Sequence, residues 1–158
     1  MRWRSGGSVE LLKGNSANNE RRLLIETDLL LALISPGDRH HGEAKGLFEN
    51  AGVRLCLSPY SLTELDLLIR AKEIMFTEAG LFYASLGNLL EYYDIGLPTP
   101  KPAYHGKAYE LRSKHRGLTY FDSLHAAVGI VENLRLVSYD KEYAQVGGLK
   151  YSHPKECL

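Results

Sequence analysis

The chain has 158 residues, of which 44% are hydrophobic and 24% are charged. These values are typical of one globular domain with a buried core, and they exclude a collagenous or largely disordered chain. Nineteen Lys and Arg residues balance nineteen Asp and Glu residues. A basic field over the whole molecule is therefore excluded, and any basic surface for nucleic acid must be local.

Cysteine content and hydropathy bear on the cellular setting. Cys56 and Cys157 stand far apart and form neither a CxxC motif nor a Cys/His metal-site spacing. The longest apolar run, residues 29–34, is much shorter than the roughly 20 residues of a membrane span. No apolar signal-peptide segment follows Arg2 and Arg4. We therefore expect a soluble, cytoplasmic protein that has no membrane partner.

The first 22 residues differ in composition from the rest of the chain. They mix Gly, Ser and Asn with charged residues and contain only a brief apolar stretch. This composition predicts a poorly ordered or loosely docked tail over residues 1–22. The folded domain is predicted over residues 23–158.

From residue 23 onward, segments typical of strands alternate with segments of helical spacing. Strands are predicted at residues 23–28, 53–57, 95–97, 134–139 and 149–152. Helices are predicted at residues 44–51, 61–75, 82–93, 104–115 and 119–131, with Met75 among the core residues. This alternation predicts right-handed crossovers and an α/β fold, a three-layer α/β/α sandwich around a mostly parallel sheet.

Acidic residues fall where the strands of such a sheet end or where the following helices begin. They are Glu26, Asp28, Glu64, Asp122 and Asp140, and we expect the first two to share one face of the first strand. Two unit charges about 4 Å apart repel by roughly 4 kcal/mol at an effective dielectric near 20. A convergent group therefore needs shared protons or a divalent cation. Oxygen ligands favour Mg²⁺ or Mn²⁺, whose chemistry here would be phosphoryl transfer.

Three of these acids also have local structural explanations. Glu64 forms a candidate capping box with Ser61, and Asp122 stands in the same relation to Thr119. Asp140 is a candidate N-cap for the residues that follow it. Sequence alone leaves capping and metal binding open at each position.

Four segments together resemble the motifs of the PIN-domain nucleases, which include the ribonuclease toxins of VapBC-type toxin–antitoxin pairs. They are residues 26–33 (ETDLLLAL), 61–65 (SLTEL), 121–127 (FDSLHAA) and 136–143 (LVSYDKEY). Their order and spacing match the family from about residue 23 to residue 148. The resemblance implies an α/β/α sandwich, a homodimer, an antitoxin partner for a toxin, bound Mg²⁺ or Mn²⁺, and endonuclease activity on RNA.

Matched position by position, Glu64, Asp122 and Asp140 resemble the second, third and fourth acids of the family. The first acid departs from the usual pattern, because Glu26 stands at the Asp position and Asp28 at the Asn or Ser position. A glutamate is one methylene longer, so we keep both as candidates. The resemblance makes all five residues candidate catalytic and metal-ligating groups, with Glu64 orienting or deprotonating the attacking water.

Other side chains are candidates for supporting roles. Thr27 and Ser138 are expected to hydrogen-bond the acids, and His125 lies one helical turn after Asp122, where it would pack, support the site or touch substrate. The stretch from residue 101 to residue 116 carries a candidate RNA-binding patch. Its basic members are Lys101, Lys107, Arg112, Lys114 and Arg116. An ordinary solvated helix face is the alternative.

The leading hypothesis is thus a metal-dependent ribonuclease, either a toxin or an RNA-processing enzyme. One alternative is a catalytically weakened PIN-like domain that binds RNA or a protein partner. The other is a Mg²⁺-dependent phosphatase of the haloacid-dehalogenase type, which needs an Asp-x-Asp pair after the first strand. Residues 26–28, Glu-Thr-Asp, lack the aspartate at the nucleophile position.

Overall fold

The computed structural model describes residues 22–158. The predicted tail, residues 1–22, lies outside the described residues apart from Arg22, which begins the first strand. The strands are β1 (Arg22–Ile25), β2 (Arg54–Leu57), β3 (Arg135–Val137) and β4 (Lys150–Ser152). The helices are α2 (Thr27–Ile34), α3 (His41–Phe48), α4 (Tyr60–Arg70), α5 (Ala79–Tyr92), α6 (Pro102–Lys114) and α7 (Tyr120–Val131), with 3₁₀ turns η1 (Lys141–Gln145) and η2 (Pro154–Glu156). None of the helices in the described part is long and apolar enough to cross a membrane.

The four strands form one parallel sheet in the order β2-β1-β3-β4. β1 lies in the middle and pairs with β2 on one side and β3 on the other. The predicted strand at residues 95–97 contributes a single parallel bridge between Gly96 and Cys56 at the outer side of β2. The prediction of a mostly parallel central sheet is confirmed.

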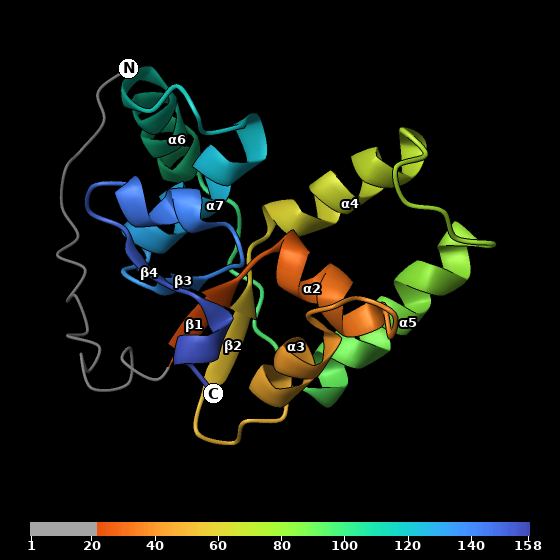
Figure 1. Ribbon diagram of the computed structural model, residues 1–158. Helices are drawn as coiled ribbons and strands as arrows, with labels where there is room; N and C mark the ends of the chain where they lie inside the picture. Colours follow the sequence, from red (N-terminus) through yellow and green to blue (C-terminus); the bar gives the residue numbers. More distant parts are fainter. Residues whose placement is uncertain (1–21) are drawn as a thin grey trace, which may run out of the picture.

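Helices cover both faces of this sheet (Figure 1). Successive side chains of a strand point to opposite faces, and the buried residues divide accordingly. Leu23 and Ile25 join the core beneath α2, α3 and α5, whereas Leu24 joins the core beneath α6 and α7. The prediction of a three-layer α/β/α sandwich is therefore confirmed.

The segment after β1 differs from the prediction. The strand predicted over residues 23–28 ends before Glu26, and α2 begins directly after that residue. Leu29 and Leu33, four residues apart, are both buried in the core, which favours a helix there. Glu26 and Asp28 therefore do not share a strand face. Glu26 is the N-cap residue of α2 and Asp28 lies in its first turn.

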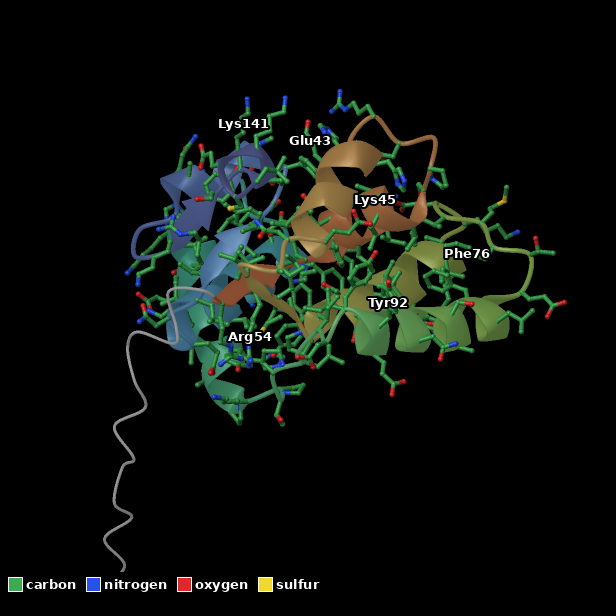
Figure 2. All side chains as sticks on the ribbon, turned by 90° about the horizontal axis from the view of Figure 1, so that it is seen from below. Glu43, Lys45, Arg54, Phe76, Tyr92 and Lys141 are labelled. Atoms are coloured by element: carbon green, nitrogen blue, oxygen red, sulfur yellow. The ribbon has the colours of Figure 1, made fainter. Side chains whose placement is uncertain are left out.

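Helices α4 and α5 project to one side of the sandwich as an arm, joined at its outer end by residues 71–78 (Figure 1). α4 ends at Arg70, so the predicted helix over residues 61–75 is too long. Met75 lies in the joining turn and is 83% exposed, which makes its predicted core position wrong. Figure 2 shows Phe76 toward the outer end of the arm and Tyr92 nearer the sheet. The outer end of this arm is thus away from the strand ends, whereas its inner end, the start of α4, directly follows β2.

Candidate functional site

The ends of β1 and β3 bring two carboxylates to one hydroxyl group. The Ser138 Oγ lies 2.8 Å from Glu26 Oε1 and 2.7 Å from Asp28 Oδ2. Asp28 Oδ2 also accepts a hydrogen bond from the Tyr139 amide, and the Ser138 Oγ accepts one from the Asp140 amide at 2.9 Å. Parallel pairing of β1 with β3 places these groups together, because both strands end at the same edge.

This pair of carboxylates is electrostatically strained without a cation. Burial raises the pKa of Glu26 well above its ordinary value, and the negative charge of Asp28 raises it further. Burial also raises the pKa of Asp28, although hydrogen bonds from Ser138 and Tyr139 oppose this effect. The Ser138 hydroxyl has one proton, so it can donate a full hydrogen bond to only one of the two carboxylates. The second contact is a full hydrogen bond only if that carboxyl group carries a proton of its own.

A second cluster holds Glu64 by a single oxygen. Its Oε2 accepts a hydrogen bond from the Thr27 hydroxyl and lies 3.1 Å from His125 Nε2. The other ring nitrogen of His125, Nδ1, lies 2.7 Å from the Ser58 Oγ. His125 Nε2 is also 3.7 Å from Glu26 Oε2, which links the two carboxylate clusters. Side chains of α2, α4 and α7 therefore meet at Glu64, and Ser58 after β2 supports them through His125.

The capping explanation for Glu64 is wrong. Helix α4 begins one residue before Ser61, its N-cap position is Pro59, and no side chain caps it. Glu64 therefore lies one turn inside the helix and reaches across to α2 and α7. Burial tends to raise the pKa of Glu64, but hydrogen bonds from His125 and Thr27 outweigh burial and lower it. Glu64 is held as a carboxylate.

The capping explanations for Asp122 and Asp140 are both confirmed. Asp122 Oδ2 accepts from the Thr119 amide at 3.0 Å, and the Thr119 hydroxyl accepts from the Asp122 amide. Asp140 Oδ1 accepts from the Glu142 amide at 2.9 Å and caps η1. These caps do not remove either residue from the site. Asp122 is close enough for its charge to raise the pKa of Glu26.

Tyr143 connects these last two acids to the first pair. Its side chain is fully buried, and its hydroxyl donates to Asp122 Oδ1 at 3.4 Å. Burial raises its pKa well above 10, and the charges of Glu26, Asp122, Asp28 and Asp140 raise it further, in that order. All four carboxylates thus act on one buried phenol. The five predicted acids therefore surround one edge of the sheet.

The donor set at this edge suits a hard divalent cation. Ligand atoms of Glu26, Glu64 and His125 lie within 4.8 Å of one another. Among residues 22–158, no Lys or Arg forms an ion pair with any of the five acids. Hydroxyls, backbone amides and one imidazole are their only partners there. Carboxylate oxygens without a cationic side chain fit Mg²⁺ or Mn²⁺, and all five acids are candidates to hold the ion.

Three residues of the predicted basic patch are paired with acids. Lys101 Nζ lies 2.5 Å from Glu132, just beyond the C-terminal end of α7. Lys107 and Lys114 each lie 2.7 Å from Glu110, and their hydrogen bonds and charges lower the pKa of Glu110 to about 2. Among the described residues, Arg112 and Arg116 are thus the members of the patch that form no ion pair, and Lys101 lies at the far end of α7 from Asp122.

Arg112 is the member of the patch that approaches the acids. Its Nη1 donates to the Ser123 Oγ at 2.6 Å, next in sequence to Asp122. Its guanidinium also lies over the exposed ring of Tyr120, 5.0 Å from the ring centre. Arg116 is exposed in the loop before α7. These two arginines stand on the side of the site formed by α6 and α7.

Two features of the site were not assigned by sequence reasoning. Ser58 stands 67 positions before its partner His125, and nothing in its neighbourhood marks it. Tyr143 was quoted in a motif without a role, although an aromatic residue in a polar segment after a strand is a weak sign of burial. The supporting positions Thr27 and Ser138 do contact carboxylates, at Glu64 and at Glu26 and Asp28.

Comparison with known proteins agrees with this geometry. The sequence pattern of the PIN domain family matches residues 23–149. Among solved structures, VapC20 from Mycobacterium tuberculosis, described as a sarcin–ricin loop cleaving toxin, has a TM-score of 0.63 at 21% identity, over 79% of this chain and 95% of that one. VapBC2 from Rickettsia felis, in a complex with a DNA fragment from its promoter, has a TM-score of 0.61 at 18% identity, over 84% of this chain and 98% of that one. A toxin–antitoxin complex from Klebsiella pneumoniae has a TM-score of 0.58 at 20% identity, over 84% of this chain and 97% of that one. Identities this low show a shared fold. No curated protein matches the chain.

Proposed function

The chain belongs to the PIN domain family, and from this premise we propose that it is a metal-dependent endoribonuclease that hydrolyses phosphodiester bonds of RNA. The observation that carries the proposal is the gathering of five acids at one sheet edge without a Lys or Arg partner among the described residues. A purely structural role gives no reason to accept this repulsion.

Each acid has a part in the proposed reaction. Glu26, Asp28, Glu64, Asp122 and Asp140 would hold Mg²⁺ or Mn²⁺, which when bound supplies a water of lowered pKa and neutralises phosphate charge. We assign Glu64, whose pKa is lowered by hydrogen bonds from His125 and Thr27, as the group that would accept the proton of the attacking water. Ser138 holds Glu26 and Asp28 at a fixed separation, so their oxygens need little reorganisation.

RNA is the proposed substrate because a cation and an aromatic ring lie beside the acids. Arg112 is fixed on Ser123 and stacks over Tyr120, which is 55% exposed. A guanidinium suits a phosphate, and an exposed aromatic ring suits an unpaired base. Arg116 extends this surface. We therefore expect single-stranded or looped RNA to cross the site from the α6–α7 side.

A cleavage assay tests this function. Wild-type protein should cut RNA with Mg²⁺ or Mn²⁺ and stop with a chelator, and Asp122→Asn should lose at least about 100-fold in rate while keeping the Thr119 cap. The control is Glu91→Gln, an exposed acid on α5 away from the site. Equal, chelator-resistant cutting by wild type and Asp122→Asn would refute the proposal. Tight RNA binding without cutting would favour a binding domain. Turnover of a small phosphoester that is faster than that of RNA would favour a phosphatase.

We also propose that the protein acts in the cytoplasm as the toxin of a toxin–antitoxin pair, as a homodimer bound by its antitoxin. Two similar structures contain such pairs. The outer end of the arm carries exposed large apolar side chains, with Met75 83% and Leu81 64% exposed, beside a hollow lined by Phe76, Leu81 and Phe82, which is typical of protein-binding surfaces. Light scattering of the purified chain, alone and with the product of a small neighbouring gene, tests both interactions. A protein that stays monomeric and does not bind this product would refute both the homodimer and the antitoxin complex.

A further inference from the structure

His125 is a buried polar side chain that the proposed reaction does not use. Its ring is fully buried, as is the side chain of Ser58. His125 Nδ1 lies 2.7 Å from the Ser58 Oγ, and its Nε2 lies 3.1 Å from Glu64 Oε2. Burying a polar ring costs stability unless its nitrogens form hydrogen bonds. The contacts with Ser58 and Glu64 satisfy both ring nitrogens.

The directions of these hydrogen bonds follow from the chemistry of the partners. An ionised carboxylate only accepts, so His125 Nε2 carries a proton and donates it to Glu64. Thr27 donates to the same oxygen, Oε2. Glu64 Oε1 accepts no hydrogen bond from the described residues. Glu26 Oε2, at 3.7 Å from Nε2, is too far for a hydrogen bond and does not compete for that proton.

We propose that His125 is a positioning residue that, together with Thr27, fixes Glu64 through Oε2 and leaves Oε1 free for the metal ion. Ser58 orients the ring by occupying Nδ1, so that Nε2 keeps its proton and faces Glu64. This inference rests on the proposed function and names how one of its carboxylates is oriented.

The rival assignment makes His125 a ligand. Its Nε2 lies with Glu26 and Glu64 in one group of ligand atoms within 4.8 Å. To ligate, Nε2 would have to lose its proton, and the hydrogen bond to Glu64 would be lost with it. Mg²⁺ also prefers oxygen to imidazole nitrogen. The two assignments therefore differ in one observable, the proton on Nε2 when Mg²⁺ is bound.

The first test follows that proton in wild-type protein without RNA. Nitrogen-15 NMR of labelled histidine side chains should show Nε2 of His125 protonated before and after Mg²⁺ is added, with only a small change in its chemical shift. Loss of the Nε2 proton on Mg²⁺ binding would overturn the proposal. The His125→Gln variant identifies the resonance.

The second test uses a matched pair of variants and direct binding of Mn²⁺, measured from the electron paramagnetic resonance of the free ion. Both His125→Gln and His125→Asn remove the ring, but the longer glutamine amide can reach Glu64 as Nε2 does, and the shorter asparagine amide cannot. We expect Mn²⁺ affinity to fall about 10–100-fold in His125→Asn and to recover largely in His125→Gln. A purely packing role would weaken both equally.

The failures are distinguishable. If both variants bind Mn²⁺ as wild type does, or both lose affinity equally, the positioning role is refuted while the metal site stands. If wild-type protein binds no Mn²⁺, the metal site and the proposed function fail together with the inference.

Discussion

Replacing Glu26 by Gln is expected to stabilise the metal-free protein. Glu26 is 6% exposed, and its Oε1 shares the Ser138 hydroxyl with Asp28 Oδ2. Burial, followed by repulsion from Asp28, raises its pKa well above the ordinary value. The amide removes the charge and keeps the shape, and its NH₂ group can donate to Ser138, whose own proton is then free for Asp28.

The distances set the size of the effect. Because the two carboxylate oxygens lie 2.8 and 2.7 Å from one hydroxyl, they are at most about 5.5 Å apart. At an effective dielectric near 20, two unit charges at this distance repel by about 3 kcal/mol. Wild-type protein escapes part of this cost by binding a proton. We therefore expect Glu26→Gln to gain about 1–3 kcal/mol at pH 8, a rise in Tm of roughly 2–12 °C.

The pH dependence has a definite sign. A carboxyl group whose pKa is raised in the folded state stabilises the fold most below its unfolded pKa, about 4.3 for Glu. That contribution is lost as the pH rises through the folded pKa. The pKa of Asp28 is also raised, so it acts in the same direction. The advantage of Glu26→Gln should therefore grow from pH 4 to pH 8.

The assay is thermal unfolding in chelator over this pH range, with Glu91→Gln as the exposed control. Added Mn²⁺ should reverse the order, because an ion at 100 times its Kd stabilises wild-type protein by about 2.7 kcal/mol. Mn²⁺ should stabilise the Glu26→Gln variant less, because the variant lacks one of the carboxylates proposed to hold the ion. A Glu26→Gln variant less stable than wild type at pH 8 in chelator, with the control unchanged, would refute the electrostatic reasoning.

Three smaller changes test the local structure. Thr119→Ala removes the hydroxyl half of the α7 capping box and should cost about 1 kcal/mol in urea unfolding, whereas Thr119→Ser should cost little; equal losses would contradict the cap. Gly87→Ala, on an exposed face of α5 with nothing within 4 Å of the added Cβ, should stabilise by up to about 1 kcal/mol. Gly129→Ala places its Cβ 2.8 Å from Leu149 Cδ1, so Leu149 must shift and the variant should be less stable than Gly87→Ala; equal stability would contradict this packing.

The sheet was predictable because β1, β2 and β3 are mostly apolar on both faces and are separated by segments of helical spacing. The boundary after β1 was not. The run of residues 29–34 is apolar throughout, and a short run of this kind does not distinguish a strand from a buried helix. Only packing decides between them, since Leu29 and Leu33 fill the core beside α3. That decision moved Glu26 and Asp28 from a strand face to the start of a helix.

The positions of the acids at the sheet edge were predictable, and so were several of their partners, including Thr27, Ser138 and Thr119. The contacts of Ser58 and Tyr143 were not. In a parallel sheet, a carboxylate that follows a strand or begins the next helix lies at the edge formed by the carboxyl ends of the strands. The contact between Ser58 and His125 joins two residues 67 positions apart, and either one alone is unremarkable in sequence. Lys107 and Lys114 stand three residues before and four residues after Glu110 on one helix, a spacing that allows both ion pairs and leaves the two arginines of the patch without an ion pair among the described residues.

Capping and metal binding looked like competing explanations in the sequence, but the geometry makes them complementary. Asp140 gives Oδ1 to the Glu142 amide, and Asp122 gives Oδ2 to the Thr119 amide. Glu64 gives Oε2 to its two donors from other helices. Each carboxylate is thus held through one oxygen by a neutral or imidazole donor, and the remaining oxygen has at most a long contact. A cap of this kind fixes an acid in place without neutralising it, so its charge stays available for a cation.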